Sequence, residues 1–231
     1  MTTQSLKNDI LGTTRLVNAG DTAFVERDTR TAHTCVRWLA RRLAAREAAA
    51  LAALADVEHV PRLLEFDGAV VRRSYLKGVP LYEAPPRSRA YFVRALRLLR
   101  LLHRAGIAHN DLAKEANWLV AAGETCAIVD FQLATTLGSP RRGTTLGRPP
   151  SGTTKGRSAR FRRRAYEDLR HLLKHKRTYQ PLALTARQRR VLARPTLPTH
   201  LWRVLAKPVY QFVTRAVLGW PDRAGPIERR G

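Results

Sequence analysis

The stretch that decides the fold is IAHNDLAKEANWLV, residues 107–120, which is followed ten residues later by Asp130-Phe-Gln. The pattern predicts two polar loops joined by two short apolar strands, with Gly123 in the turn between the strands. A hairpin of this kind returns the chain to where it started. We therefore expect Asp111, Asn117 and Asp130 to lie together at one edge of a small sheet.

These residue types are those that phosphoryl transfer requires. An acid must orient the attacking hydroxyl, oxygen ligands must hold Mg²⁺ on the phosphates, and a cation should offset the charge of the transferred group. Asp111, the pair Asn117 and Asp130, and Lys114 fit these roles. Ordinary loop capping is the alternative for Asp111 and Asn117, and a solvated loop lysine is the alternative for Lys114. The joint spacing with Asp130 favours the catalytic interpretation.

Three phrases carry a family resemblance: HNDLAKEANW, DFQLA and EDLRHLLKHK, which begin at residues 109, 130 and 167. The first two resemble the catalytic loop and the metal-binding Asp-Phe-Gly of protein kinases. The chain as a whole resembles the compact RIO-like and lipopolysaccharide-kinase-like proteins of bacteria. The resemblance implies a compact, two-lobed, protein-kinase-like α+β fold. Its reduced N-lobe would span residues 1–76 and its reduced C-lobe residues 77–231.

The resemblance also implies a role for each matching residue. Asp111 corresponds to the catalytic aspartate, and His109 to the histidine that braces its loop. Asn117 and Asp130 correspond to the ligands of Mg²⁺. Asp168 resembles the helix aspartate that anchors the catalytic loop from below. The implied cofactors are ATP and Mg²⁺.

The sequence departs from the usual kinase pattern at several points. One residue is inserted after Asp111, so that the lysine and asparagine each follow one position late. Gln132 replaces the usual glycine, which makes a backbone flip at that position less easy. No Gly-x-Gly-x-x-Gly motif is present. Gly12 is the candidate for a reduced phosphate-covering turn, and an ordinary turn glycine is its alternative.

The nucleotide side of the predicted cleft depends on four further residues. The lysine that usually grips the phosphates is absent, and Arg27 occupies the matching position. Arginine also binds phosphate, but its guanidinium is bulkier and planar, so it does not replace a lysine without consequence. Glu47 lies on the apolar stripe of its predicted helix, so its carboxylate needs a cation, and Arg27 is the candidate. The alternative is that the helix phase is misassigned and Glu47 is an ordinary acid of the helix surface. Adenine is expected near Tyr75 and Leu76.

Hydrophobic spacing and turn residues predict the remaining elements. Short strands are expected within residues 6–28 and a hairpin within residues 62–75. Gly106 is expected as the C-cap of the second helix. Helices are expected at residues 36–56, 88–105, 165–176 and 184–193.

The charge of the chain indicates a polyanionic partner. Lysine and arginine number 42 against 18 acids, which gives a net charge of +24. Residues 139–164 carry nine of these basic residues and no acid, and we expect them to be flexible and able to dock an acidic substrate. Residues 201–220 are expected to form a packed terminal helix pair or to contact an anionic membrane surface.

The predicted function is therefore that of a kinase, an ATP-dependent phosphotransferase of the serine/threonine type. The expected partner is an acidic or phosphorylated acceptor, either a protein or the lipopolysaccharide core. A core sugar kinase and a pseudokinase binding module are the alternatives, and nucleic acid is not favoured. Two cysteines without metal-type spacing and no signal-like N-terminus predict a cytoplasmic protein. Peripheral contact with the inner membrane is a second option.

Overall fold

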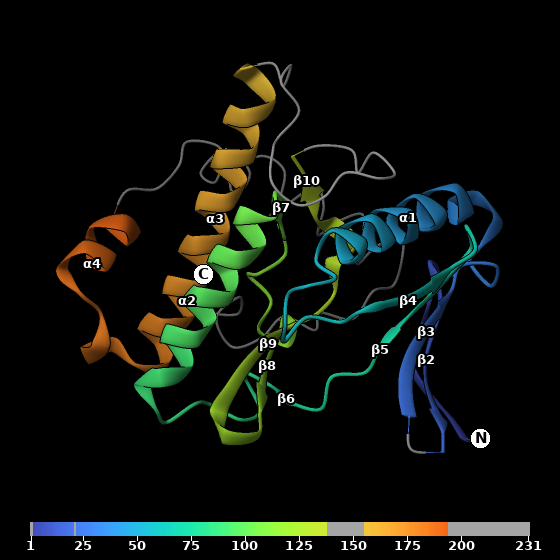
Figure 1. Ribbon diagram of the computed structural model, residues 1–231, viewed down its shortest axis with the longest axis horizontal. Coiled ribbons are helices and arrows are strands. Elements are labelled where there is room, and N and C mark those ends of the chain that lie inside the picture. The colour runs from blue at the N-terminus through green and yellow to red at the C-terminus, as the bar shows by residue number, and fades with distance from the viewer. Residues whose placement is uncertain (1, 21, 138–154, 194–231) are drawn as a thin grey trace, which may run out of the picture. The chain divides into compact units, whose positions relative to one another are not determined.

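The computed structural model describes residues 2–20, 22–137 and 155–193. The chain forms two compact units, which divide between Leu172 and Leu173. Figure 1 shows the elements of both units. The expected lobe boundary near residue 76 falls inside the first unit and stays a prediction.

The first unit begins with a five-stranded antiparallel sheet (Figure 1). Its strands lie in the order β1-β2-β3-β5-β4. This confirms the short strands predicted within residues 6–28 and the hairpin predicted within residues 62–75, although the first strand starts earlier than expected. The strands are β1 (Thr2–Asp9), β2 (Gly12–Ala19), β3 (Thr22–Asp28), β4 (Leu63–Phe66) and β5 (Val70–Ser74).

Helix α1 (Arg37–Ala53) packs against strands β4 and β5 of this sheet. Its alanine-rich sequence has high helix propensity. Small side chains at Ala44 and Ala48 let the helix approach Val71 closely, with Leu63 and Phe66 at the margin of the cluster. The helix predicted over residues 36–56 is confirmed within a few residues at each end.

The register of β3 and β5 decides which charged side chains face α1. Arg27 lies opposite Val71, and Glu26 lies opposite Arg72. Because successive side chains point to opposite faces of a strand, Arg27 and Arg73 share the face of Val71, which packs on α1. Glu26 and Arg72 belong to the other face.

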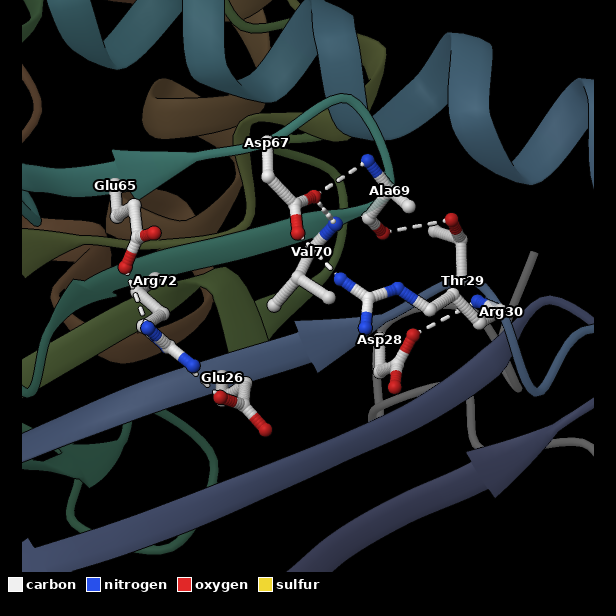
Figure 2. A network of polar contacts seen from close by, with 9 residues as sticks. All are labelled: Glu26, Asp28, Thr29, Arg30, Glu65, Asp67, Ala69, Val70 and Arg72. Atoms are coloured by element: carbon white, nitrogen blue, oxygen red, sulfur yellow. Dashed lines mark hydrogen bonds and ion pairs between the residues drawn. The ribbon is translucent and has the colours of Figure 1, made fainter.

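Arg72 forms an ion-pair network on that other face, as Figure 2 shows. Its guanidinium donates from Nε to Glu26 Oε2 over 2.8 Å and from Nη1 to Glu65. The three residues come from β3, β4 and β5. The network therefore ties three neighbouring strands together at a partly exposed position.

The turn between β4 and β5 is closed by Asp67 (Figure 2). Its Oδ1 accepts hydrogen bonds from the backbone N–H of Val70 over 2.7 Å and of Ala69 over 2.8 Å. Arg30 contacts the other carboxylate oxygen. The backbone hydrogen bonds of Val70 and Ala69, more than the charge of Arg30, hold the pKa of Asp67 below its ordinary value.

The rest of the described part of the first unit contains two α-helices, short 3₁₀ turns and two small sheets. Strands β6, β8 and β9 form one sheet, and β7 pairs with β10. The elements are β6 (Val79–Pro80), α2 (Arg89–Arg104), β7 (Ile107–Ala108), β8 (Trp118–Ala121), β9 (Thr125–Ile128), β10 (Thr135–Thr136) and the start of α3 (Lys155–Tyr179).

Helix α2 confirms the helix predicted over residues 88–105. Ser88 caps its N-terminus by accepting the N–H of Ala90 over 3.0 Å. Gly106 follows its end with a φ of 74°, a left-handed conformation that favours glycine. The buried face of the helix is lined by Tyr91, Phe92, Ala95, Leu98, Leu99 and Leu102.

Helix α3 corrects one expectation. It begins at Lys155, ten residues before the predicted start, so residues 155–164 are helical although the sequence predicted a flexible segment. Arginine has high helix propensity, and Phe161 supplies a buried anchor with 8% of its surface exposed. The rest of that segment, residues 139–154, and the predicted terminal pair at 201–220 lie outside the described residues.

Residues 173–193 are the described part of the second unit. They contain the end of α3, a single 3₁₀ turn and α4 (Ala186–Ala193). Thr185 and Gln188 form a reciprocal capping box: the N–H of each residue donates to the side chain of the other, over 3.1 and 3.2 Å. The helix predicted over 184–193 is confirmed.

Within the described part of the chain, no helix combines the length and the apolar character that a membrane span needs.

The Asp67 turn gives the first prediction. Asp67→Ala should lower the melting temperature at pH 7 by a few degrees, because two backbone N–H groups lose their acceptor. Since folding lowers the pKa of Asp67, its contribution is complete above about pH 4 and is lost as the pH falls through the folded-state value. Thermal melts from pH 7 to pH 3 should therefore show the gap to wild type closing, with exposed Asp56→Ala as control. A gap that is constant with pH would contradict this account of the turn.

Candidate active site

The β8–β9 hairpin brings the predicted metal ligands to one place. Asn117 directly precedes β8, and Asp130 lies two residues beyond the end of β9. Trp118 pairs with Ile128, and the N–H of Val129 donates to the carbonyl of Asn117 over 3.1 Å. The two ligands thus lie at the same end of the hairpin, as the sequence predicted.

The loop from Asp111 to Asn117 closes on the carboxylate of Asp111. Asn117 donates from Nδ2 to Asp111 Oδ2 over 3.1 Å and to its carbonyl over 2.9 Å. Lys114 Nζ donates to the same Oδ2 over 2.8 Å and has 52% of its side chain exposed. The residue inserted after Asp111 therefore does not prevent Lys114 and Asn117 from reaching it.

His109 braces this loop from inside the fold. The ring is fully buried and stacks at a tilt on Phe131, with 4.7 Å between ring centroids. The N–H of Asp111 points at His109 Nδ1 over 3.3 Å, and Nε2 lies 3.0 Å from the carbonyl of Val129. Since an N–H can only donate, Nδ1 must accept and Nε2 carries the proton. His109 thereby links Asp111 to the residue before Asp130.

Asp168 anchors the same loop, as the resemblance implied. Its buried carboxylate accepts the backbone N–H of His109 over 2.8 Å and of Asn110 over 2.9 Å. His103 Nε2 lies 3.3 Å from the same carboxylate. Two consecutive backbone donors are thus fixed by one side chain from α3, and they immediately precede Asp111.

Asn110 is a site residue that the sequence prediction missed. Its Nδ2 donates over 2.8 Å to both the carbonyl of Leu133 and the hydroxyl of Thr135, so it joins the loop of Asp111 to the segment after Asp130. Its φ is 65°, in the left-handed region. Asparagine tolerates this region better than most residues, and its position between His109 and Asp111 was the available signal.

The donor set at Asp130 and Asn117 fits a Mg²⁺ ion. Asp130 Oδ1 is buried and accepts no hydrogen bond from the described residues. Asn117 uses Nδ2 for Asp111, so Oδ1 is the atom that would bind the cation. No group of three or more acidic, histidine or cysteine side chains suits a metal within the described residues. Mg²⁺ commonly takes only one or two protein oxygens and completes its shell with phosphate and water.

Arg27 and Glu47 lie together, and Arg73 joins them. Arg27 Nη1 is 3.9 Å from Glu47 Oε2, and Arg73 Nη1 forms an ion pair with Glu47 Oε1. Glu47 is fully buried and Arg27 is 5% exposed. Burial lowers the pKa of Arg27, and the carboxylates of Asp130 and Asp9 oppose that shift. Arg73 was missed because its partner is set by strand pairing, which its own sequence neighbourhood does not reveal.

Backbone geometry explains why residue 12 is a glycine. It has a φ of 116° in the β1–β2 hairpin, and a Cβ at this position would lie 2.3 Å from the carbonyl oxygen of Asp28. Only glycine allows so close an approach. The ordinary turn interpretation thus suffices for Gly12, and its nucleotide role stays a prediction.

Tyr75 and Leu76 follow β5 directly. The N–H of Tyr75 donates to the carbonyl of Ala23 over 3.3 Å, and the Tyr75 side chain is 37% exposed. Leu76 is half-buried. Their expected contact with adenine stays a prediction.

The Asp168 anchor gives the second prediction. Asp168→Ala should destabilise the fold by about 2–5 kcal/mol, because two buried N–H groups lose their acceptor. Asp168→Asn should cost less, since one amide oxygen can still accept. Denaturant unfolding checks both variants. Equal stability of Asp168→Ala and wild type would contradict the anchoring role.

Comparisons with known proteins agree with this geometry at the level of the fold. No protein-family model and no curated protein matches the chain. The crystal structure of the Rio2 kinase from Chaetomium thermophilum does match, with a TM-score of 0.55 and 14% identity, over 81% of this chain and 60% of that one. Its ADP/Mg²⁺–phosphoaspartate complex matches with a TM-score of 0.54 and 14% identity, over 82% and 60%.

These matches support the kinase-like fold that the resemblance implied. The chain spans about 60% of the length of the Rio2 kinase chains that it matches. At this identity the likeness concerns the fold alone. The chain has a compact, kinase-like α+β fold.

Proposed function

We propose that this chain is a phosphotransferase that moves the γ-phosphate of Mg–ATP to a hydroxyl group. The observation that carries the proposal is the convergence of Asp111, Asn117 and Asp130 at one end of the β8–β9 hairpin, on a loop held by His109. A kinase-like fold supports the same reaction class. The ADP/Mg²⁺ complex of the structurally similar Rio2 kinase supports these cofactors.

Each residue of the site has a separate role in the proposed reaction. Asp111 orients the acceptor hydroxyl through its carboxylate and takes up its proton as the new bond to phosphorus forms and the bond from the γ-phosphorus to ADP breaks, with ADP as the leaving group. Asn117 and Asp130 would hold Mg²⁺, which neutralises charge on the phosphates when it is bound. Lys114 contacts Asp111 Oδ2 and is half exposed, so it can offset charge on the transferred group. Arg27 would hold the phosphates from the sheet side.

The acceptor that we propose is acidic or phosphorylated. The net charge of +24 favours an anionic molecule. A serine or threonine hydroxyl on a protein is the first choice, as the RIO-like resemblance implies. A sugar hydroxyl of a lipopolysaccharide core is the second. The corresponding location is the cytoplasm of a bacterium, with peripheral contact at the inner membrane for the lipid acceptor.

A pseudokinase is the rival function, and two observations favour it. Arg27 replaces the phosphate-binding lysine, and Gln132 replaces the glycine that follows Asp-Phe. A pseudokinase would bind nucleotide without turnover. Transfer that depends on Asp111 separates the two functions.

The third prediction concerns transfer of label from γ-labelled ATP, measured by incubating the protein with fractionated bacterial extract. Asp111→Asn should lower label transfer about 10²–10⁴-fold, since it removes the base that orients the hydroxyl. Mg–ATP affinity should stay within about threefold of wild type, because Asp111 acts on the acceptor. Asp56→Asn removes an exposed carboxylate of the same kind and serves as the matched control.

The fraction that takes the label identifies the acceptor. Label in protein supports the serine/threonine type, and label in the lipid–glycan fraction supports the core sugar kinase. If the protein binds nucleotide but no fraction takes up label in a way that depends on Asp111, the proposal is contradicted and the pseudokinase is favoured.

A further inference from the structure

The buried carboxylate of Glu47 contacts two arginines, where one basic partner was expected. We propose that Arg73 is the structural partner of Glu47, and that this pairing leaves Arg27 free to bind the phosphates of a nucleotide. The inference rests on the proposed function for the identity of the anion. The division of roles between the two arginines stands on contacts within the described residues.

Strand register places both arginines beside the same carboxylate. Val25 pairs with Arg73, and Arg27 pairs with Val71, so the two guanidiniums lie diagonally across β3 and β5 on the face that packs against α1. Glu47 comes from α1 and has no exposed surface. One acidic side chain on the helix thus faces two basic side chains on the sheet.

The two contacts are unequal. Arg73 Nη1 forms a close ion pair with Glu47 Oε1, whereas Arg27 Nη1 stays 3.9 Å from Oε2, near the limit of an ion pair. Arg27 Nη1 and Arg73 Nη1 are both buried without a hydrogen bond to the described residues, so the distances to Glu47 are what distinguish the two arginines. A buried guanidinium N–H without an acceptor is costly, and a phosphate oxygen would supply one.

Charge balance favours an anion beside the two arginines. Burial lowers the pKa of both arginines, and the charge of Arg27 lowers that of Arg73 further. Asp130 is the carboxylate that favours the charged form of both. If Mg²⁺ engages Asp130, two arginines remain with Glu47 alone, which leaves one positive charge for phosphate. Asp9 also favours charged Arg27, but it is already paired with Lys7 over 2.6 Å.

The consequence is a competition for Glu47. Without Arg73, the carboxylate would retain only Arg27 and draw it into a buried ion pair. Arg27 would then have to leave Glu47 unpaired in order to bind phosphate. Loss of Arg73 should therefore weaken nucleotide binding indirectly, and neutralising Glu47 should restore it.

Titration calorimetry on the full chain tests this competition. Arg73→Met should weaken Mg–ATP binding about tenfold or more, the usual worth of one charge-assisted hydrogen bond. Adding Glu47→Gln should return the affinity to within about threefold of wild type. Arg27→Met should weaken binding to a similar degree, and Glu47→Gln should not rescue it. Adenosine affinity should stay the same throughout.

Arg72→Met is the matched control. It removes an arginine from the same strand, but Arg72 lies on the opposite face and binds Glu26 and Glu65 (Figure 2). Mg–ATP affinity should be unchanged in this variant. A loss as large as that of Arg73→Met would overturn the inference, since any arginine of β5 would then have the same effect.

Thermal unfolding without nucleotide gives a second, independent readout. Arg73→Met should lower the melting temperature by about 10 °C, because a buried carboxylate loses one of its two charged partners and Arg27 must move to compensate. Arg27→Met should lower it by less than half as much. If Arg73→Met does not fold, Arg73→Lys takes its place and should show a smaller loss of affinity that Glu47→Gln again reverses.

The outcomes separate this inference from the proposed function. If wild type binds Mg–ATP and Arg73→Met binds it equally well, the division of roles is overturned, but the phosphotransferase proposal still stands. A loss that Glu47→Gln does not reverse would overturn it too. No Mg–ATP binding by wild type would overturn both proposals.

Discussion

The buried carboxylate of Asp168 holds two consecutive backbone N–H groups, and the geometry of the site depends on this interaction. It fixes the backbone of His109 and Asn110, and thereby the position of Asp111, which follows them in the loop. Buried backbone donors are rarely left without acceptors, so the loop has little freedom to adopt another path. His109 then carries the constraint across to the carbonyl of Val129, next to Asp130.

The sheet side of the site is held by charge instead of backbone hydrogen bonds. Two guanidiniums and two carboxylates gather there: Arg27, Arg73, Glu47 and Asp130. A buried ion pair is weak support for stability, because desolvation offsets much of its attraction. We interpret the cluster as a site for an anion and a cation that arrive together, as the phosphates and Mg²⁺ of a nucleotide do. The sequence alone would not have distinguished this from a conventional single pair.

Much of the site could be predicted because its residues are close in sequence. Asp111, Asn117 and Asp130 are joined by one short hairpin, and hairpin geometry returns the chain to its starting edge. The position of Glu47 followed from helical periodicity. The pairing of Arg27 with Glu47 followed from the family resemblance and from the need of a buried acid for a cation.

The features that could not be predicted depend on distant parts of the chain. Arg73 reaches Glu47 only through the register of β3 and β5, strands that lie more than forty residues apart. Asn110 acts through a left-handed backbone conformation and through acceptors beyond Asp130. The early start of α3 was missed because a run of basic residues resembles a solvated loop in composition, while Phe161 is the one buried side chain among residues 158–164.

A crystal structure of the chain with Mg²⁺ and a non-hydrolysable ATP analogue tests the central claim most directly. We expect the metal to bind Asp130 and Oδ1 of Asn117, the phosphates to contact Arg27, and the terminal phosphate to lie in line with Asp111. A nucleotide bound elsewhere, or a metal that Asp130 does not touch, would contradict the account.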